Sequence, residues 1–275
     1  MRKKIVLIAC LSLIVAGLSA QVDSLRIHYY ENYPFAYKEG GKLKGIEIDI
    51  MEEYVAWLKQ KKNISVHVSY VPFEEFSGFY SSVKGGSSNV VGLGSVTEST
   101  ERANEVAFSP PYLQNVSVLV TDGSVATIKS NDAVSVARSL NGMRAIVVNK
   151  SSHLKHLKKM YESSRLNDAE VKIVFTEKQT NVLDSIAANK RVFGYVDVVA
   201  YWSFVKKNPS RFLKIQKVLN VPNETFGFIM PKGNLHAPYL SEFFESGFGF
   251  TSTKMYHQVL EKYLGYEIID LVEVK

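Results

Sequence analysis

Residues 94–102 read Gly-Ser-Val-Thr-Glu-Ser-Thr-Glu-Arg, and residues 108–112 follow with Phe-Ser-Pro-Pro-Tyr. Two short hydroxyl residues, Ser95 and Thr97, lie two positions apart, and Arg102 comes five positions later. Hydroxyls and free backbone N–H groups can donate to one carboxylate oxygen, and the guanidinium fork can donate to both oxygens. The stretch therefore predicts a receptor for a carboxylate; an ordinary helix N-cap is the alternative.

The rest of the chain alternates extended and helical patterns in two successive runs. The first run has extended residues 25–30, 64–70 and 90–91, with helices predicted around residues 48–58 and 76–83. The second run has extended residues 145–148, 171–175 and 193–196, with helices around residues 154–161, 182–187 and 198–205. This alternation predicts an α/β fold with right-handed crossovers and largely parallel sheets.

Two extended segments connect these runs. Residues 112–123 lie between the runs, with a strand expected at residues 116–120, and the chain returns through residues 225–230. Two such segments between two α/β lobes are what a hinge requires. About 255 residues beyond the N-terminal segment are enough for two modest lobes or one large domain.

The order of these features resembles the periplasmic solute-binding proteins of family 3, which serve bacterial amino-acid ABC importers. Members typically carry Ser/Thr-x-Thr-x-x-x-x-Arg and then Phe-Ser-x-Pro-Tyr, as residues 95–112 do here. Further matching segments are Tyr33-Pro34-Phe35, residues 45–50 (Gly-Ile-Glu-Ile-Asp-Ile), residues 226–233 (Phe-Gly-Phe-Ile-Met-Pro-Lys-Gly) and residues 255–265, which end in Tyr-Leu-Gly. The resemblance covers nearly all of the chain beyond the N-terminal segment, in the right order.

The resemblance implies an α/β, two-lobed periplasmic binding protein fold of type II. Each lobe would be a mostly parallel sheet with helices on both faces, and two crossover strands would join the lobes. We expect lobe 1 to comprise residues 21–118 and 226–275, and lobe 2 to comprise residues 119–225. The family arrangement also implies that the last helices, near residues 240–244 and 253–264, pack on lobe 1.

The resemblance further implies which residues contact the ligand. Arg102 would grip the α-carboxylate, with Thr97 and Ser95 as hydroxyl and backbone donors; a turn or cap role is the alternative for these two. Asp197, which ends the segment Gly194-Tyr195-Val196-Asp197, would pair with the α-ammonium, because a buried ammonium needs such a partner. A helix N-cap is the alternative for Asp197.

Lobe 2 contributes a second candidate donor loop. Ser151 and Ser152 follow a predicted strand and open a predicted helix, so they are expected either to donate to an anion or to cap the helix. Lys150 stands where the family usually has glycine. That lysine could add a positive charge facing the ligand.

Aromatic residues crowd the start of lobe 1, and Tyr33 or Phe35 could stack on a ligand side chain. Asn32 is the alternative occupant of the position where the family has tyrosine. His153 and His156 lie three positions apart on a predicted helix, a spacing that can hold a metal, but no acidic or cysteine partner lies near them in sequence. We therefore expect no metal, no cofactor and no catalytic residue.

The N-terminus has the pattern of an export signal. The charged start Arg2-Lys3-Lys4 precedes an apolar run at residues 5–18, and Ser19-Ala20 offers small residues for cleavage before Gln21. Residues 7–10 also fit a lipoprotein box ending at Cys10, but they leave an apolar region of only about five residues, below the usual length. We predict a signal peptide at residues 1–20 and a periplasmic location, with lipid anchoring through Cys10 as the less favoured alternative.

Charge and cysteine content exclude several classes of function. Removing the signal takes away three positive charges and no negative ones, which lowers the formal net charge from +6 to about +3. That excess is small, and there is no basic stripe with interleaved aromatics, so nucleic acid is not an expected partner. The sole cysteine would leave with the signal, which excludes disulfides and thiolate chemistry.

The expected function is capture of a small zwitterion, an amino acid, between two lobes that close around it, for delivery to an ABC permease in the inner membrane. We expect a monomer that is not an enzyme. A dehydratase-like periplasmic enzyme, with Glu98 or Asp197 as its acid, and a ligand-sensing module are the alternatives. The ligand could also be a dicarboxylate or a peptide fragment.

Overall fold

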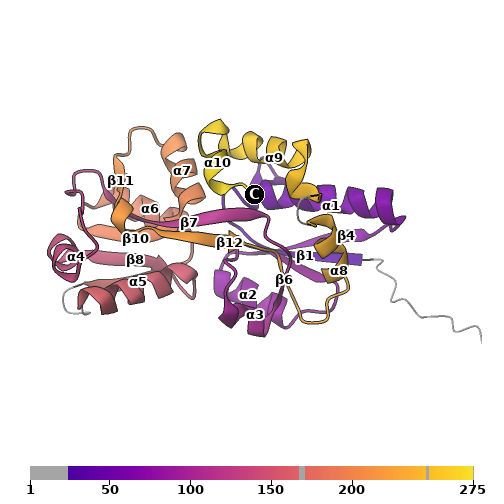
Figure 1. Cartoon of the computed structure of the whole chain (residues 1–275), viewed down its shortest axis with the longest axis horizontal. Coiled ribbons are helices and arrows are strands. Elements are labelled where there is room, and N and C mark those ends of the chain that lie inside the picture. The colour runs from indigo at the N-terminus through magenta and orange to yellow at the C-terminus, as the bar shows by residue number, and fades with distance from the viewer. Residues whose placement is uncertain (1–23, 167–170, 246–247, 275) are drawn as a thin grey trace, which may run out of the picture.

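Two β-sheets lie one after the other along the long axis of the molecule, each packed against helices (Figure 1). This computed structural model describes residues 24–166, 171–245 and 248–274. The predicted signal peptide at residues 1–20, with Cys10, lies outside the described residues. Two long strands, β7 (Leu113–Asp122) and β12 (Val221–Phe226), run side by side between the two halves.

The first sheet, in the strand order β4-β1-β5-β13-β6, forms lobe 1. Its parallel core consists of β1 (Ser24–Tyr30), β4 (His67–Phe73) and β5 (Val90–Leu93), and its antiparallel edge of β13 (Ile229–Met230) and β6 (Ala107–Phe108). A hairpin of β2 (Tyr37–Glu39) and β3 (Lys42–Lys44) precedes α1 (Ile46–Lys62). The helix α2 (Phe76–Lys84) connects β4 to β5, and the short α3 (Thr100–Glu105) precedes β6.

The second sheet, in the order β11-β7-β10-β8-β9 with β12 also paired to β7, forms lobe 2. The strand β8 (Arg144–Val148) is parallel to β9 (Lys172–Thr176) and β10 (Val192–Asp197), whereas β7 is antiparallel to β10, β11 (Leu213–Ile215) and β12. The helices are α4 (Ala133–Leu140), α5 (Ser152–Ser164), α6 (Gln179–Ala188) and α7 (Val198–Lys207). The largely parallel arrangement expected from the sequence therefore holds for the βαβ core of each lobe. The parallel arrangement does not extend to the crossover strands β7 and β12, because a strand that returns beside its outgoing partner runs antiparallel to it.

The chain ends on lobe 1 and on the crossover. The helices α8 (Ala237–Phe243) and α9 (Lys254–Leu264) pack against α1, and α10 (Ile269–Val272) packs against β7. Short 3-10 helices η1 (Lys217–Leu219), η2 (Phe250–Ser252) and η3 (Tyr266–Ile268) complete the described elements. The lobe boundaries predicted at residues 118/119 and 225/226 fall inside β7 and at the end of β12 and stay predictions.

Several segments differ from the expectation. The alternation at residues 64–70 predicts a strand, and β4 begins at residue 67, where His67 pairs with Ser24 at the start of β1. The return segment at residues 225–230 is split between β12 and β13, and between them the Gly227 N–H donates to the Val96 carbonyl at 3.3 Å. The hairpin β2–β3, the edge strand β11 and the helix α4 were not predicted.

Buried apolar side chains form two clusters. The larger fills lobe 1 and continues along β7, β10, α6 and α7, and the smaller lies in lobe 2 with α4 and α5. Within the described ranges, no helix combines the length and the apolar character that crossing a bilayer requires. The larger cluster joins the two lobes, so the loops at the strand ends meet across a shared boundary.

Candidate ligand-binding site

A small cavity lies between the lobes, at the carboxyl ends of parallel strands. Tyr30 ends β1, Val148 ends β8 and Asp197 ends β10, and all three line the cavity. In α/β proteins this edge is the usual ligand site, because the loops that leave the strands converge there. The cavity has a volume of about 30 Å³. Six predicted site residues line it: Ser95, Thr97, Arg102, Ser151, Ser152 and Asp197.

The fold places Arg102 by a local cap and by aromatic stacking. The Ser99 hydroxyl caps α3 by accepting a hydrogen bond from the Arg102 backbone N–H at 3.3 Å. The guanidinium lies over the rings of Phe76 and Tyr80, at 5.4 and 5.8 Å from their centroids. Arg102 is only 8% exposed, and this burial lowers its pKa, although a guanidinium stays charged in proteins. A stacked, buried cation therefore stands at the edge of the cavity.

The hydrogen bonds of Arg102 go to neutral groups. Its Nη1 donates to the Thr97 carbonyl at 2.9 Å, and its Nη2 lies 3.5 Å from the Lys150 carbonyl of lobe 2. Among the residues that the structure describes, no carboxylate forms an ion pair with this guanidinium. The cation thus donates to both lobes with no carboxylate at ion-pair distance, and Glu101, Glu224 and Asp197 act on it only over a longer range.

A buried carboxylate supports the loop before Arg102. Glu47 Oε1 accepts hydrogen bonds from the N–H groups of Gly94, at 3.1 Å, and Ser95, at 2.9 Å, and from the Tyr112 hydroxyl. Ser95 has a positive φ of 45°, and its hydroxyl accepts from Asn32 Nδ2 at 3.2 Å. Burial raises the pKa of Glu47 to about 7. These bonds fix an otherwise unfavourable turn beside the cavity.

Asp197 is surrounded by donors. The residue is only 2% exposed. Its Oδ1 accepts from Asn115 Nδ2 at 2.7 Å and lies 3.1 Å from His153 Nε2, and its Oδ2 accepts from Gln179 Nε2 at 2.5 Å. The Asp197 N–H donates in return to Gln179 Oε1 at 2.7 Å. Asp197 occupies the N-cap position of α7, but its side chain makes no capping hydrogen bond.

The lobe 2 donor loop combines capping with contact across the lobes. The Ser151 hydroxyl accepts from the Leu154 N–H at 3.4 Å, so it caps α5, and it donates to the Val148 carbonyl at 2.6 Å. The Ser152 hydroxyl instead lies 3.2 Å from the Thr97 hydroxyl of lobe 1. Lys150 has a positive φ of 56°, a conformation that glycine adopts most readily.

The predicted aromatic residues do not line this cavity. Phe35 is fully buried in the core of lobe 1, with its ring 5.6 Å from that of Phe226. Tyr33 lies in a separate groove, where Lys207 Nζ of lobe 2 stands 3.3 Å from its ring centroid. Tyr30 lines the cavity instead, and its hydroxyl donates to the Glu177 carbonyl. The position of Tyr30 at the end of the first strand is the signal that could have identified it.

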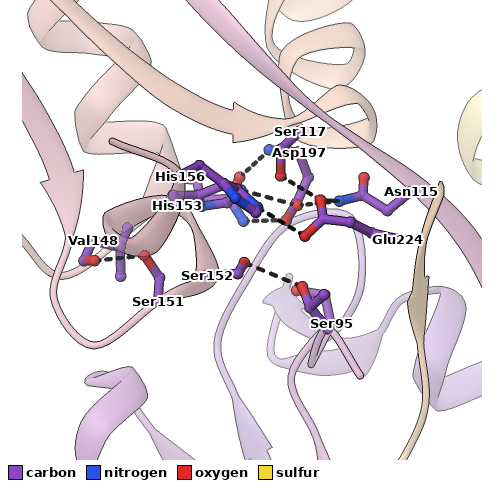
Figure 2. Close-up of polar contacts among 12 residues, drawn as sticks. Ser95, Asn115, Ser117, Val148, Ser151, Ser152, His153, His156, Asp197 and Glu224 are labelled. Atoms are coloured by element: carbon purple, nitrogen blue, oxygen red, sulfur yellow. Dashed lines mark hydrogen bonds and ion pairs between the residues drawn. The ribbon is translucent and has the colours of Figure 1, made fainter. Parts of the chain in front are cut away.

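Further polar side chains behind Asp197 were not predicted as one group. Figure 2 shows that His153 and His156 of α5 face carboxylates from two other elements. His156 Nε2 lies 2.9 Å from Glu224 Oε1 of β12, and the other Glu224 oxygen accepts from Ser117 at 2.5 Å. Within the described part of the chain, no three His, Cys, Asp or Glu side chains form a set that could hold a metal. Each of these two histidines instead has one carboxylate partner.

The sequence matches the family described as "Bacterial extracellular solute-binding proteins, family 3" over residues 25–265. A relative from Bacillus subtilis (strain 168), the "Probable amino-acid-binding protein YxeM", is 29% identical over 167 residues, which make up 61% of this chain and 56% of the relative. The match thus spans little more than half of that relative's length.

Two solved structures have the same fold. An ancestral arginine-binding protein bound to arginine superposes with a TM-score of 0.66, at 24% identity over 88% of this chain and 98% of its own. A structure from work on glutathione import through GshT and the cystine ABC importer TcyBC of Streptococcus mutans superposes with a TM-score of 0.68. Its sequence identity is 21%, and the match covers 88% of this chain and 95% of its own. Together with the family match over most of the chain, this fold shows that the chain belongs to the bacterial extracellular solute-binding proteins of family 3.

Proposed function

We propose that this chain binds an amino acid between its lobes and delivers it to an ABC importer. The observation that carries the proposal is Arg102, a buried cation with no ion pair in the described chain, on a cavity that Asp197 also lines. A buried charge needs a partner, and the α-carboxylate of an amino acid would supply one. Membership of the family and the name of the Bacillus relative support this class of ligand.

Arg102 has guanidinium N–H donors that remain available for a carboxylate. A guanidinium carries five N–H donors, and two of its hydrogen bonds here go to carbonyl oxygens. We propose that the other donors bind the ligand's carboxylate. The hydroxyls of Thr97 and Ser152, now 3.2 Å from each other, would turn to the same group.

Asp197 has room for one further donor. An ionised carboxylate offers about four acceptor positions, and Asn115, His153 and Gln179 occupy three of them. We propose that the ligand's ammonium takes the remaining position at Oδ2, where only Gln179 donates. The two amides hold the carboxylate in place without neutralising its charge.

We propose that uptake requires the lobes to part, with β7 and β12 bending near the predicted boundaries at residues 118/119 and 225/226. The cavity of about 30 Å³ is far below the roughly 300–1,000 Å³ of small-molecule sites, so it is too small for an amino acid as it stands. The contact of Thr97 with Ser152 would be exchanged for contacts with the ligand. The ligand would favour the closed form only by binding it more tightly.

Export and delivery are further parts of the proposal. We propose that residues 1–20 are a signal peptide, that the chain acts as a periplasmic or extracellular monomer, and that its closed form is recognised by an ABC permease. The extracellular family and the importer named with the Streptococcus structure support this arrangement. We propose binding without chemical change of the ligand.

Calorimetric titration of the exported protein with each common amino acid tests the proposal. At least one amino acid should bind with one-to-one stoichiometry and raise the melting temperature by mass action. Mass spectrometry should recover that ligand unchanged after incubation. Failure of every amino acid to bind, or conversion of the bound one, would contradict the proposal.

A further inference from the structure

A second hollow opens directly beside the cavity. It is a groove of about 410 Å³ between α2 and α3 of lobe 1 and α5 of lobe 2. Phe76, Arg102 and Ser151 line both the groove and the cavity. A ligand whose carboxylate binds Arg102 could therefore extend into the groove without leaving the cleft.

The groove carries an excess of positive charge. Its basic residues are Lys84, Arg102, Lys150, Lys155 and Lys158, and its acidic residues are Glu101 and Glu105. Lys84 pairs with Glu105 at 2.9 Å, and Lys155 pairs with Glu101. Both acidic residues thus already form ion pairs with lysines of the same groove. Arg102, Lys150 and Lys158 are left with no ion pair among the described residues.

The floor of the groove is aromatic. The rings of Phe76 and Tyr80 stack at 6.2 Å, with an angle of 28° between their planes, and Arg102 lies over both. Leu154 adds an apolar side chain from α5. Solvent screening is weaker beside these apolar side chains, so Arg102, which is buried among them, attracts an anion more strongly than a cation on an open surface does, whereas Lys150 and Lys158 are exposed at the groove.

We propose that this groove is a subsite for a second carboxylate of the ligand. The inference rests on the proposed amino-acid function and narrows it to amino acids or short peptides that carry an additional acidic group. The organic part of such a ligand would lie on Phe76 and Tyr80, and its second carboxylate would face Lys150 and Lys158. A ligand with a cationic side chain is disfavoured, because the groove already holds three unpaired positive charges.

Probes that differ in one charge test the subsite directly. L-glutamate is titrated against L-glutamine, and glycyl-L-glutamate against glycyl-L-glutamine, because each pair differs only by a carboxylate and an amide. In each pair that binds, the acid should have a lower Kd than the amide. The ratio of the two Kd values should fall toward one as ionic strength rises.

Two substitutions assign that advantage to the groove. Lys158→Gln removes a charge from α5, and Lys150→Asn removes one with a residue that tolerates positive φ. Both lysines are exposed, so each substitution should weaken binding of the acid about two- to fivefold at most, the range for exposed ion pairs, and leave the amide nearly unchanged. Lys159→Gln is the matched control, since Lys159 is exposed on the same helix and does not line the groove.

The outcomes separate this inference from the function on which it rests. If amides bind as well as acids, or if Lys159→Gln weakens the acid as much as Lys158→Gln, the subsite is wrong and amino-acid binding stands. If neither the acids, the amides nor any other amino acid binds, both proposals fail. Preferential binding of L-arginine also overturns the subsite, because that ligand would place a fourth cation in the cleft.

Discussion

The two sides of the cleft present their charged groups in opposite ways. On lobe 1, Arg102 donates only to two backbone carbonyls. On lobe 2, Asp197 already has donors from Asn115, His153 and Gln179. A buried cation with no carboxylate at ion-pair distance gains more from a charged ligand than a carboxylate with three donors does. We therefore expect the ligand's carboxylate to dominate affinity and its ammonium to set selectivity.

The residues that hold the loop beside Arg102 also differ from those that hold Asp197. The loop beside Arg102 is held by Glu47, whose Oε1 takes three hydrogen bonds while its Oε2 is buried without a partner among the described residues. Asp197 is held mainly by the amides of Asn115 and Gln179, with donors at both of its oxygens. Lobe 1 thus fixes its donors with a carboxylate whose ionisation is unfavourable, whereas lobe 2 fixes its acceptor with two amides and the ring of His153.

Removing Arg102 should produce the largest effect on binding. Truncating one partner of a desolvated, hydrogen-bonded charge pair costs about 2–5 kcal/mol, so Arg102→Ala should weaken amino-acid binding between about thirtyfold and a few thousandfold. Isothermal titration calorimetry measures this loss. Arg102→Lys is the matched variant, because it keeps the charge but not the two-pronged donor, and it should recover part of the affinity. Unchanged affinity of Arg102→Ala would remove the carboxylate half of the proposed site.

The Glu47 support should give the stability of the protein a pH dependence of unusual sign. Burial raises the folded-state pKa of Glu47 from its ordinary 4.5 to about 7, so the folded state binds this proton more tightly than the unfolded state. Its contribution to the free energy of unfolding is therefore full below pH 4.5, falls as pH rises to 7, and is level above. The total fall is on the order of 3 kcal/mol.

Urea denaturation of the parent and of Glu47→Gln, below and above this pH window, isolates the contribution. Glutamine keeps an acceptor oxygen for the Gly94 and Ser95 N–H groups but does not titrate. The stability of the parent relative to the variant should fall across the window. Parallel curves for the two proteins would mean that Glu47 does not titrate there and that the loop has a different support.

Asp197→Asn should have a smaller and more selective effect. A hydrogen bond to a charged group contributes roughly 1.5–3 kcal/mol, so the variant should bind an amino acid about tenfold to a hundredfold more weakly. The deaminated analogue has no ammonium and should lose much less. Asparagine also brings an NH₂ group among the donors around Asp197, so the unfolding free energy of the variant is measured as a control.

The two ligands together distinguish the roles that Asp197 can have. Equal, small changes for both ligands would mean that Asp197 has only a structural role at the start of α7. Tighter binding of the carboxylic acid by Asp197→Asn would contradict an ammonium partner, because it would show that the native charge repels the true ligand.

Much of this architecture could be predicted because it depends on local patterns. Arg102 follows a capped turn, and Asp197 ends a buried strand and begins a helix, so each carries its own signal in a few neighbouring residues. The βαβ alternation then brings such strand ends to one edge. These local signals, together with the resemblance to the family, indicate the approximate positions of the two charges.

The remaining contacts depend on register between distant segments, which periodicity does not encode. Asn115 reaches Asp197 because β7 pairs with β10 in one particular register, and Glu47 meets Ser95 across 48 positions. Tyr30 and Tyr33 are equally plausible stacking residues in sequence. Only the fold separates them, since Tyr30 ends β1 at the cavity and Tyr33 lies beyond the strand in another groove.

Tyr33→Ala should have the smallest effect on binding affinity. The size of that effect distinguishes a ring that stacks on the ligand from a ring that contacts the other lobe. Lys207 Nζ of α7 lies 3.3 Å from the Tyr33 ring centroid, so the contact favours the closed arrangement without touching the cavity. Such cation–π contacts contribute about 0.5–1 kcal/mol at exposed sites, and Tyr33→Ala should therefore weaken binding by no more than about fivefold. Lys207→Gln should weaken binding to the same extent. The double variant should be no weaker than either single variant, because all three remove the same interaction. A loss well beyond this for Tyr33→Ala alone, with Lys207→Gln unaffected, would place the ring on the ligand after all.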